Sequence, residues 1–318
     1  MKFPPAEFPR FFQETVGRPL RTGVLLRDHS NFRIGGPADF FFEAVSIEEV
    51  RTALSAARSC GIRSYLIGGG YNLLFADAGF RGLIVKNAAG GMSLERLSPE
   101  KYRLIAMSGT PLGDLVEFCA ANALSGLEFL TGIPGSVGGA VYGNAGAFGR
   151  CLGDVLEEAD LLSSEGIPRR ETRKYFEFAY RHSRLKATGE VVLQASFVPA
   201  PGDRAEIRFR MDEILALRAS RHPSRGLAYA GSYFKNYLGP DGVKTPAGYL
   251  LDQVGSKEAA VGGAAVFAGH ANFLYNRGDA TAADILTLAR ELKERVRAKF
   301  GLELAEEVIF LQAEPEDG

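Results

Sequence analysis

The segment that decides the fold is GIPGSVGGAVYGNAGAFG, residues 132–149. Seven of its positions are glycine, which is too many for any regular element to keep by propensity alone. A second glycine cluster, residues 68–70, directly follows the apolar stretch Ser64–Ile67, which is typical of a strand. Consecutive glycines after a strand leave backbone N–H groups open to a ligand, because no Cβ keeps the ligand away. Two such loops favour a ligand with two phosphates or an extended dinucleotide.

The first glycine loop departs from two common phosphate-binding motifs. Leu73 stands where the third glycine of the Rossmann fingerprint belongs, and a strand-like stretch follows where a helix would begin. The loop also has no Walker lysine. Taken alone, the triple glycine is as compatible with a tight turn as with a phosphate site. The second glycine segment makes the dinucleotide the better interpretation.

Composition excludes several classes of protein. The chain has 318 residues and a mass of 34.3 kDa, which gives room for about two or three compact units. Its 37 basic and 38 acidic residues leave a net charge of −1 and form no basic block, so a nucleic-acid partner is disfavoured. No apolar run reaches about eighteen residues and no secretory signal pattern begins the chain. We therefore expect a cytoplasmic protein without a membrane partner.

Cysteine and histidine give no sign of a metal site. The three cysteines, Cys60, Cys119 and Cys151, form no CxxC pair, and this sparse, odd count is typical of a reducing compartment. The four histidines are scattered and lack partners at metal-ligand spacing. We expect no structural metal.

The hydrophobic pattern predicts alternating strands and helices. Ser46 and Glu49 predict a capping box that opens a helix ending near Cys60, and Thr110 is a plausible cap for a helix that ends at Ala121. Thr281 and Asp284 predict the start of a long helix that ends before Gly301. The other predicted elements are a helix near residues 8–12, a helix over 206–220, strands over 40–45, 64–67, 82–85, 102–107, 155–162, 190–198 and 302–311, and a linker over 199–203.

The order of motifs along the chain resembles one enzyme family, the UDP-N-acetylenolpyruvoylglucosamine reductases (the MurB family). The motifs that carry the resemblance are NFRIGGPAD at 31–39, the loop at 68–74, GIPGSVGG at 132–139, NAG at 144–146, YRHSRLK at 180–186, GSYFKN at 231–236, Gly255, GGA at 262–264, HANF at 270–273 and FGLELAEEV at 300–308. Because these motifs occur in order from residue 31 to 308, the resemblance is specific.

The resemblance implies an α+β flavoenzyme with the FAD-binding fold of the vanillyl-alcohol oxidase (PCMH) type. Two α/β subdomains would bind FAD, and an α+β domain would bind the substrate. We place an N-terminal extension at residues 1–28, the FAD-binding subdomains at 29–87 and 88–205, and the substrate domain at 206–301, with 302–318 rejoining the second subdomain. The FAD would be noncovalent, and NADPH would be the hydride donor.

The resemblance also assigns binding residues. Those implied for FAD are Arg33, Ile34, Gly35, Gly68, Gly69, Gly70, Tyr71, Asn72, Leu73, Thr131, Gly132, Ile133, Pro134, Ser136, Gly138, Gly139, Ala145 and Gly146. Those implied for the UDP-sugar substrate are Tyr180, Arg221, Lys235 and Asn236, of which the last three match positions that hold the diphosphate.

The implied reaction reduces the enolpyruvyl ether of a UDP-sugar in peptidoglycan precursor synthesis. Ser232 matches the proton donor, and Arg181 and Glu307 match the pair that polarises the substrate carboxylate. A serine hydroxyl protonates carbon only when the developing charge is strongly basic and the donor is well positioned, conditions that an enolate meets. A carboxylate beside that anion would repel it unless Glu307 is protonated or belongs to an Arg/Lys network, and the sequence leaves both alternatives open.

Three positions depart from the family pattern: Tyr71 where a small serine is usual, Gly143 where a bulky apolar residue is common, and Tyr237 where proline usually follows Lys235-Asn236. The short stretch between Arg181 and Ser232 indicates the compact variant, without an extra tyrosine-bearing substrate loop. We expect a monomer. Two alternatives stay open, namely another flavin-dependent oxidoreductase of this fold that acts on a hydroxy acid or sugar, and a UDP-sugar-binding protein without catalysis.

Overall fold

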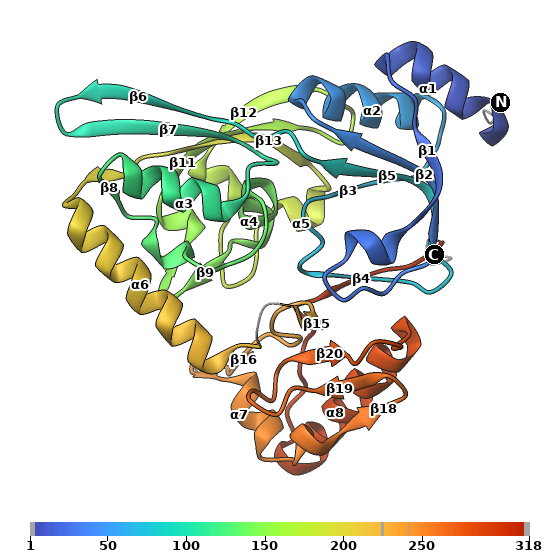
Figure 1. Cartoon of the computed structure of the whole chain (residues 1–318), viewed down its shortest axis with the longest axis vertical. Coiled ribbons are helices and arrows are strands. Elements are labelled where there is room, and N and C mark those ends of the chain that lie inside the picture. The colour runs from blue at the N-terminus through green and yellow to red at the C-terminus, as the bar shows by residue number, and fades with distance from the viewer. Residues whose placement is uncertain (1–3, 224–225, 241, 315–318) are drawn as a thin grey trace. The chain divides into compact units, whose positions relative to one another are not determined.

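A computed structural model describes residues 4–223, 226–240 and 242–314 (Figure 1). The chain divides into two compact units. Unit 1 comprises residues 1–21, 40–69 and 82–218, and unit 2 comprises 22–39, 70–81 and 219–318. The chain therefore passes several times between the units, and each unit is assembled from segments far apart in the sequence.

A mixed four-stranded sheet has the order β1-β2-β5-β3, formed by Arg21–Leu25, Pro37–Ala44, Phe80–Asn87 and Ser64–Ile67. Strands β3 and β5 are parallel, and helix α2 (Ile47–Ser59) precedes β3. The Ser46 hydroxyl caps α2 by accepting from the Glu49 amide, as predicted, whereas the Glu49 carboxylate accepts from the Val45 amide. Helix α1 (Phe8–Val16) packs on this layer through Phe8 and Phe12, which are fully buried.

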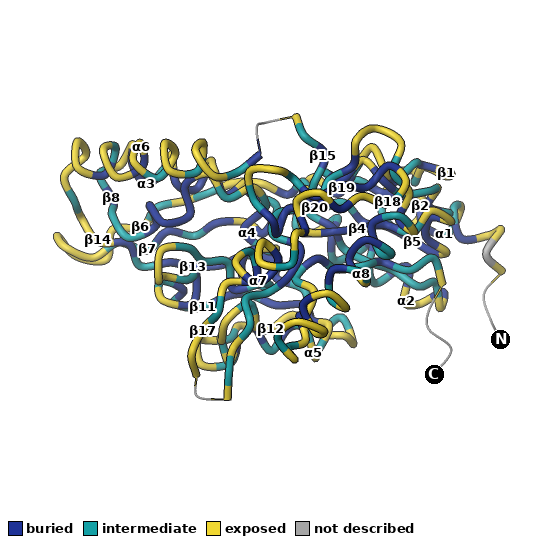
Figure 2. The backbone as a smooth tube through the Cα atoms, turned by 90° about the horizontal axis from the view of Figure 1, so that it is seen from below, coloured by how far each residue is buried: buried dark blue, intermediate teal, exposed yellow. Residues whose placement is uncertain are grey.

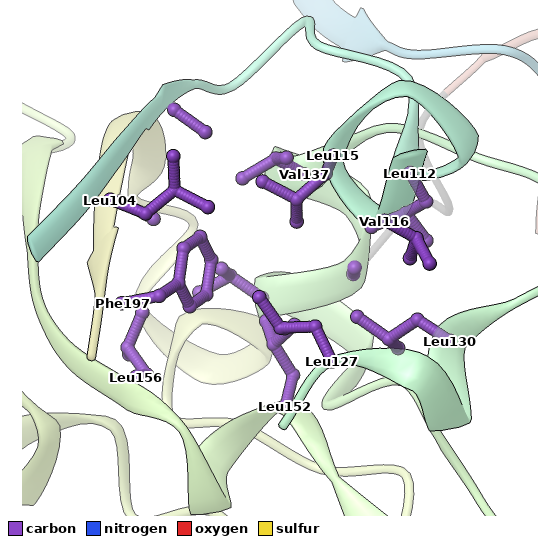
Figure 3. Packing of buried hydrophobic residues seen from close by; sticks show 14 of the residues in the cluster. Leu104, Leu112, Leu115, Val116, Leu127, Leu130, Val137, Leu152, Leu156 and Phe197 are labelled. Atoms are coloured by element: carbon purple, nitrogen blue, oxygen red, sulfur yellow. The ribbon is translucent and has the colours of Figure 1, made fainter. Parts of the chain in front are cut away.

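The larger part of unit 1 is an antiparallel five-stranded sheet of order β12-β11-β13-β7-β6. Its strands are Pro168–Thr172, Leu156–Leu162, Val191–Phe197, Lys101–Met107 and Met92–Ser98. Helices α3 (Leu112–Ala121) and α4 (Val137–Gly143) lie beside this sheet in Figure 1. Apolar side chains from the strands and both helices, such as Phe197, Leu115 and Val137, form one buried core (Figure 3).

Helix α6 (Arg204–Arg221) is mostly exposed. Only Ile207 and Met211 among its described residues are buried, and much of the helix is coloured as exposed in Figure 2. This long amphipathic segment connects the sheet of unit 1 to residues of unit 2.

Unit 2 is built around a small antiparallel sheet of order β15-β20-β19-β18, formed by Ala228–Tyr229, Leu274–Asn276, Ala264–Val266 and Ala260–Val261. Helix α8 (Ala282–Phe300) begins with a capping box between Thr281 and Asp284, as predicted, and ends at Gly301 with φ 69°. Its buried face packs with α7 (Ala247–Asp252) in a second apolar core. Strand β21 (Ile309–Leu311) pairs in parallel with β4 (Leu73–Phe75).

The remaining elements are short. They are α5 (Leu185–Thr188), β8 (Leu124–Ser125), β9 (Gly146–Ala147), β10 (Arg150–Cys151), β14 (Ala200–Pro201), β16 (Tyr237–Leu238), β17 (Lys244–Thr245), and 3-10 turns at Pro5–Glu7, Leu26–His29, Glu128–Leu130, Leu152–Asp154, Arg173–Phe176 and Ser256–Glu258. Within the described ranges, no helix has the length and apolar character needed to cross a bilayer, and no three His, Cys, Asp or Glu residues are grouped as metal ligands.

Three local predictions need correction. The N-cap residue of α3 is Pro111, because the Thr110 hydroxyl is instead paired with the backbone of Gly91. The expected linker at 199–203 contains β14, which pairs with β8. The expected strand at 302–311 is regular only over Ile309–Leu311. The second glycine segment, which propensity alone would not keep in a regular element, contains α4, because neighbouring backbone groups and buried Val137 and Val141 hold the helix in place.

Candidate active site

The first glycine loop follows β3 and turns sharply at Gly70. Gly70 has φ 70°, and a Cβ built there would lie 2.1 Å from the His29 carbonyl oxygen, so no other residue fits without a backbone shift. The Gly70 carbonyl accepts from the Asn31 amide at 3.1 Å. Asn31 begins the motif that was matched to the FAD site, so unit 2 brings this motif and Gly70 together.

The second glycine loop is fixed by backbone hydrogen bonds to the segment before α3. The Val137 amide donates to the Thr110 carbonyl at 2.9 Å, and the Gly138 amide donates to the Ser108 carbonyl at 2.8 Å. A Cβ on Gly138 would lie 2.9 Å from the Ser108 Cβ, so the close approach requires glycine. The Ser136 hydroxyl caps α4 by accepting from the Gly139 amide.

The two glycine loops meet within unit 1. A Cβ built on Gly68 would lie 2.6 Å from Ser136 Oγ. Burial and, to a lesser degree, Tyr142 raise the pKa of Tyr65, a residue of β3, to about 12. The structure therefore places the end of β3 against the start of α4, as a ligand held by both loops requires.

A buried polar atom beside the second loop fits a polar ligand. Thr131 is 4% exposed, and its Oγ1 has no hydrogen-bond partner within the described part of the chain. An unpaired buried hydroxyl is costly unless a ligand or water satisfies it. Together with the close-approach glycines, Thr131 makes this part of unit 1 suitable for the phosphate and sugar groups of a dinucleotide.

The motif at 31–39 forms a strained turn in unit 2. Arg33 is exposed with φ 55°, whereas Ile34 is buried in the core of unit 2. Gly35 has φ 141°, and a Cβ there would lie 2.7 Å from the Phe75 Cβ. Positive φ at a residue other than glycine is uncommon and often marks a functional turn.

The remaining residues assigned to FAD lie on or beside these loops. In the second loop, Gly132, Pro134 and Gly139 are exposed and Ile133 is half-buried, and Ala145 and Gly146 follow α4. In the first loop, Gly69 is exposed and lies between Gly68, which approaches Ser136, and Gly70, which approaches His29. After this loop, Tyr71 and Asn72 are exposed and Leu73 is buried on β4.

Arg181 occupies the corner of a two-residue turn in unit 1. Ala179 and His182 exchange backbone hydrogen bonds at 3.2 and 3.1 Å, which leaves Tyr180 and Arg181 at the tip. Arg181 has φ 52°, its guanidinium donates to the Gly146 carbonyl at 3.2 Å, and its Cζ lies 5.4 Å from the centre of the Tyr180 ring. The arginine is thus linked to the end of the second glycine segment.

The side chain of Asn144 holds the turn at residues 179–182. The sequence motifs did not predict a role for this residue. Its Nδ2 donates to the Ala179 carbonyl at 2.9 Å and its Oδ1 accepts from the Gly153 amide at 3.0 Å. Asn144 is buried and has φ 46° at the C-terminus of α4, a conformation that asparagine tolerates. The signal that could have identified it is an asparagine at the end of a glycine-rich helix.

Ser232 and Glu307 lie on adjacent backbone segments of unit 2. The Glu307 amide donates to the Tyr233 carbonyl at 2.8 Å, and the Lys235 amide donates to the Ala305 carbonyl at 2.8 Å. The Asn72 side chain donates to the Glu307 carbonyl at 3.0 Å. Unit 2 therefore brings together Ser232, Glu307 and the end of the first glycine loop, residues that are far apart in the sequence.

The residues assigned to the substrate differ in their surroundings. Lys235 is half-buried next to the Ser232 segment, while Arg221 is exposed at the end of α6 and Tyr180 is exposed at its turn. Asn236 Oδ1 accepts from the Ala247 amide at 3.0 Å and so also supports the start of α7.

The three departures from the family pattern are accommodated locally. Tyr71 is 40% exposed, and a Cβ on Gly143 would meet no heavy atom within 4 Å. Tyr237 begins β16 and packs against the core of unit 2.

Two family models match the chain, and known proteins match it over nearly its whole length. Residues 38–170 match an FAD binding domain, and residues 222–311 match the C-terminal domain of UDP-N-acetylenolpyruvoylglucosamine reductase. The enzyme of that name from Geobacter sulfurreducens is 41% identical over 301 residues, which cover 94% of this chain and 96% of the relative. The chain belongs to the UDP-N-acetylenolpyruvoylglucosamine reductase family. The reductase of Solibacter usitatus is 38% identical and covers 89% of this chain and 94% of its own length.

A solved structure supports the same conclusion for the fold. The crystal structure of UDP-N-acetylenolpyruvylglucosamine reductase from Thermus caldophilus has a TM-score of 0.73 and 32% identity, and covers 92% of this chain and 99% of its own. The expected family and the expected α+β fold of the FAD-binding type are confirmed. As a member of this reductase family, the chain is an FAD-dependent oxidoreductase.

Proposed function

We propose that this chain reduces UDP-N-acetylglucosamine enolpyruvate to UDP-N-acetylmuramate with NADPH, in the cytoplasm and as a monomer, in peptidoglycan precursor synthesis. The observation that carries the proposal is the family relationship over 94% of the chain. The chemistry that bound FAD would supply is hydride transfer from NADPH to the vinyl carbon of the substrate. The residues of the chain bind the reactants and control the charge and the proton of the reacting ether.

Ser232 donates the proton in this proposal. Ser232 is a half-buried residue, and the segment that carries it is held by the backbone hydrogen bonds of Tyr233 to Asn272 and Glu307. Such a donor is effective only when it is held at the right place, because its own acidity is low.

Arg181 and Glu307 polarise the substrate carboxylate. The planar guanidinium of Arg181 offers a carboxylate two parallel hydrogen bonds and a fixed charge for the developing enolate. Glu307 is half-buried, and its backbone is held to Tyr233 and Asn72. Its carboxylate acts within a network of cations or carries a proton, since an isolated anion would oppose the charge that develops.

Binding of the cofactor and of the UDP-sugar falls to separate residues. The two glycine loops and the turn at 33–35 bind FAD, while Tyr180, Arg221, Lys235 and Asn236 bind the substrate. Residues 29–87 and 88–205 are proposed as the FAD-binding subdomains, and 206–301 as the substrate domain.

Purified protein is expected to be yellow and to lose its flavin absorbance when NADPH is added without oxygen. The enolpyruvyl substrate should then restore the absorbance. Acid precipitation should release FAD to the supernatant, because in this proposal the glycine loops hold FAD through backbone contacts rather than through a covalent bond. The visible spectrum measures all three effects. Colour that stays in the pellet would contradict noncovalent binding, and a colourless protein that cannot be reconstituted would favour a UDP-sugar-binding protein.

Arg181→Lys is expected to slow flavin reoxidation by the substrate more than flavin reduction by NADPH. Lysine keeps the charge but loses the planar fork, so contact with the carboxylate weakens while the FAD site stays intact. The matched control is Arg184→Lys, because Arg184 lies three residues away and pairs with Glu177 at 3.0 Å. Rapid-mixing absorbance separates the two half-reactions. Equal slowing of both in Arg181→Lys would indicate damage to the flavin site instead.

A further inference from the structure

Asn272 holds the backbone immediately after Ser232. Its side-chain Oδ1 accepts from the Phe234 amide at 2.9 Å, and its Nδ2 donates to the Phe234 carbonyl at 2.8 Å. Its own carbonyl accepts from the Tyr233 amide at 2.8 Å. One residue thus satisfies three backbone groups of the two residues that follow Ser232, much as a neighbouring strand would.

The same backbone also holds Glu307. The Tyr233 carbonyl, which lies between the groups held by Asn272, accepts from the Glu307 amide. Phe234 and Glu306 form an isolated β-bridge. A shift of residues 233–234 would therefore disturb both the position of Ser232, which precedes them, and the hydrogen bond that holds the Glu307 backbone.

Asn272 is itself fixed by its surroundings. Asn272 is 2% exposed, and its backbone amide donates to His270 Nδ1 at 3.2 Å. Burial is the main cause that lowers the pKa of His270, and Lys257 and Arg221 add to this, while a backbone hydrogen bond and Asp252 oppose it. The lowered pKa favours the uncharged imidazole, and Nδ1 of that form can accept the hydrogen bond from the Asn272 backbone amide.

We infer that Asn272 is a positioning residue for proton donation, and that its side-chain amide sets the place of Ser232 relative to Glu307. This inference rests on the proposed function of Ser232. Asn272 contacts neither reactant; it acts through the backbone of residues 233–234. A small displacement of a proton donor is enough to slow its step, since misplacement by about 1 Å can cost about 10²-fold.

Asn272→Asp and Asn272→Ala test the inference in complementary ways. A carboxylate keeps an acceptor for the Phe234 amide but cannot donate to the Phe234 carbonyl, whereas a protonated carboxyl group can do both. Burial favours the neutral form, so the pKa of the introduced carboxyl group should be raised. Alanine can make neither bond at any pH.

The expected result is a loss in one half-reaction only. At neutral pH both variants should slow flavin reoxidation by the enolpyruvyl substrate by about 10- to 100-fold, while flavin reduction by NADPH stays close to wild type. Relative to wild type at each pH, Asn272→Asp should recover as the pH falls and Asn272→Ala should not. Dividing by the wild-type rate at each pH removes the pH dependence that all the proteins share. The charged or titratable groups nearby are His270, Arg221, Lys257 and Asp252 around the histidine, and Glu306, Glu307, Lys235 and Lys293 around the Ser232 segment.

Asn276→Ala is the matched control. Asn276 is another buried asparagine of unit 2, 6% exposed, which donates to the Phe32 carbonyl at 3.0 Å and accepts from the Gly278 and Ala280 amides. Its removal deletes a similar number of buried hydrogen bonds but none on residues 232–234. It should lower thermal stability without changing the ratio of the two half-reaction rates.

Three outcomes would overturn the inference: reoxidation at the wild-type rate in folded Asn272→Ala, equal slowing of both half-reactions, or the same change of ratio in Asn276→Ala. If Asn272→Ala does not fold, the pH dependence of flavin reoxidation in Asn272→Asp tests the inference by itself, because the loss at neutral pH and the recovery at low pH are measured in the same protein. Wild-type enzyme that does not react with the enolpyruvyl substrate would refute the proposed function rather than the role of Asn272.

Discussion

Ser232→Ala is expected to slow the oxidation of reduced flavin by the enolpyruvyl substrate by about 10²–10⁴-fold, the usual contribution of a positioned general acid. Flavin content and the rate of reduction by NADPH should hardly change, because alanine has nearly the same size and no backbone hydrogen bond of the segment is lost. Rapid mixing of the pre-reduced variant with substrate measures the effect.

Two further variants make this result specific. Ser232→Cys keeps a proton to donate and should recover part of the rate if the larger sulfur fits. Ser256→Ala removes another serine hydroxyl of unit 2, one that is fully buried and has no hydrogen-bond partner among the described residues, so it should leave both half-reactions unchanged. Reoxidation of Ser232→Ala at a rate near that of wild type would exclude Ser232 as the proton donor.

The sequence predicted the elements whose signals are local. The strand at Ser64–Ile67 has the predicted bounds, and the caps at Ser46 and Thr281 lie where the pattern placed them. These predictions succeed because a cap or a buried strand depends on a few neighbouring residues. The glycine loops were recognised for the same reason, since a positive φ or a close backbone approach demands glycine whatever the rest of the fold.

Elements that depend on distant partners were missed. Helix α4 contains three glycines, and it persists because the Ser108 and Thr110 carbonyls accept from its first amides and its valines are buried. Intrinsic propensity alone opposes such a helix, so only the tertiary contacts reveal it. Thr110 looked like a helix cap, but its hydroxyl is paired with Gly91, nineteen residues earlier in the chain.

The candidate site likewise combines residues with a local sequence signal and residues whose role depends on distant partners. Ser232 and Glu307 were proposed as site residues from their motifs, but the proximity of their backbone segments depends on the pairing of residues 233–235 with 305–307. Asn144 and Asn272 were not assigned roles, because each acts on backbone groups that are distant in sequence. An asparagine gives no local sign of which carbonyl it will hold.

Gly69→Val is expected to remove most of the FAD while the protein stays folded. Gly69 is exposed in the loop between Gly68, which contacts Ser136, and Gly70, which turns at φ 70°. A branched side chain there would occupy the space that a phosphate needs in order to reach the backbone. Steric misfit of this kind costs about 1–3 kcal/mol, which weakens FAD binding by roughly 5- to 150-fold.

Gly113→Val supplies the control that decides what this loss means. Gly113 is also an exposed glycine of unit 1, it lies on α3, and a Cβ there meets no heavy atom within 4 Å. The same substitution at this position should leave the helix at least as stable, because valine has a higher helix propensity than glycine, and should leave the FAD content unchanged. The ratio of flavin to protein absorbance, measured after dialysis and again in a titration with FAD, compares the two variants, with circular dichroism to establish that both are folded.

Full FAD occupancy in folded Gly69→Val would show that the triple glycine is only a turn. Equal losses in the two variants would instead show that FAD binding follows the stability of unit 1 as a whole, whereas loss confined to Gly69→Val places the phosphate contact at this loop.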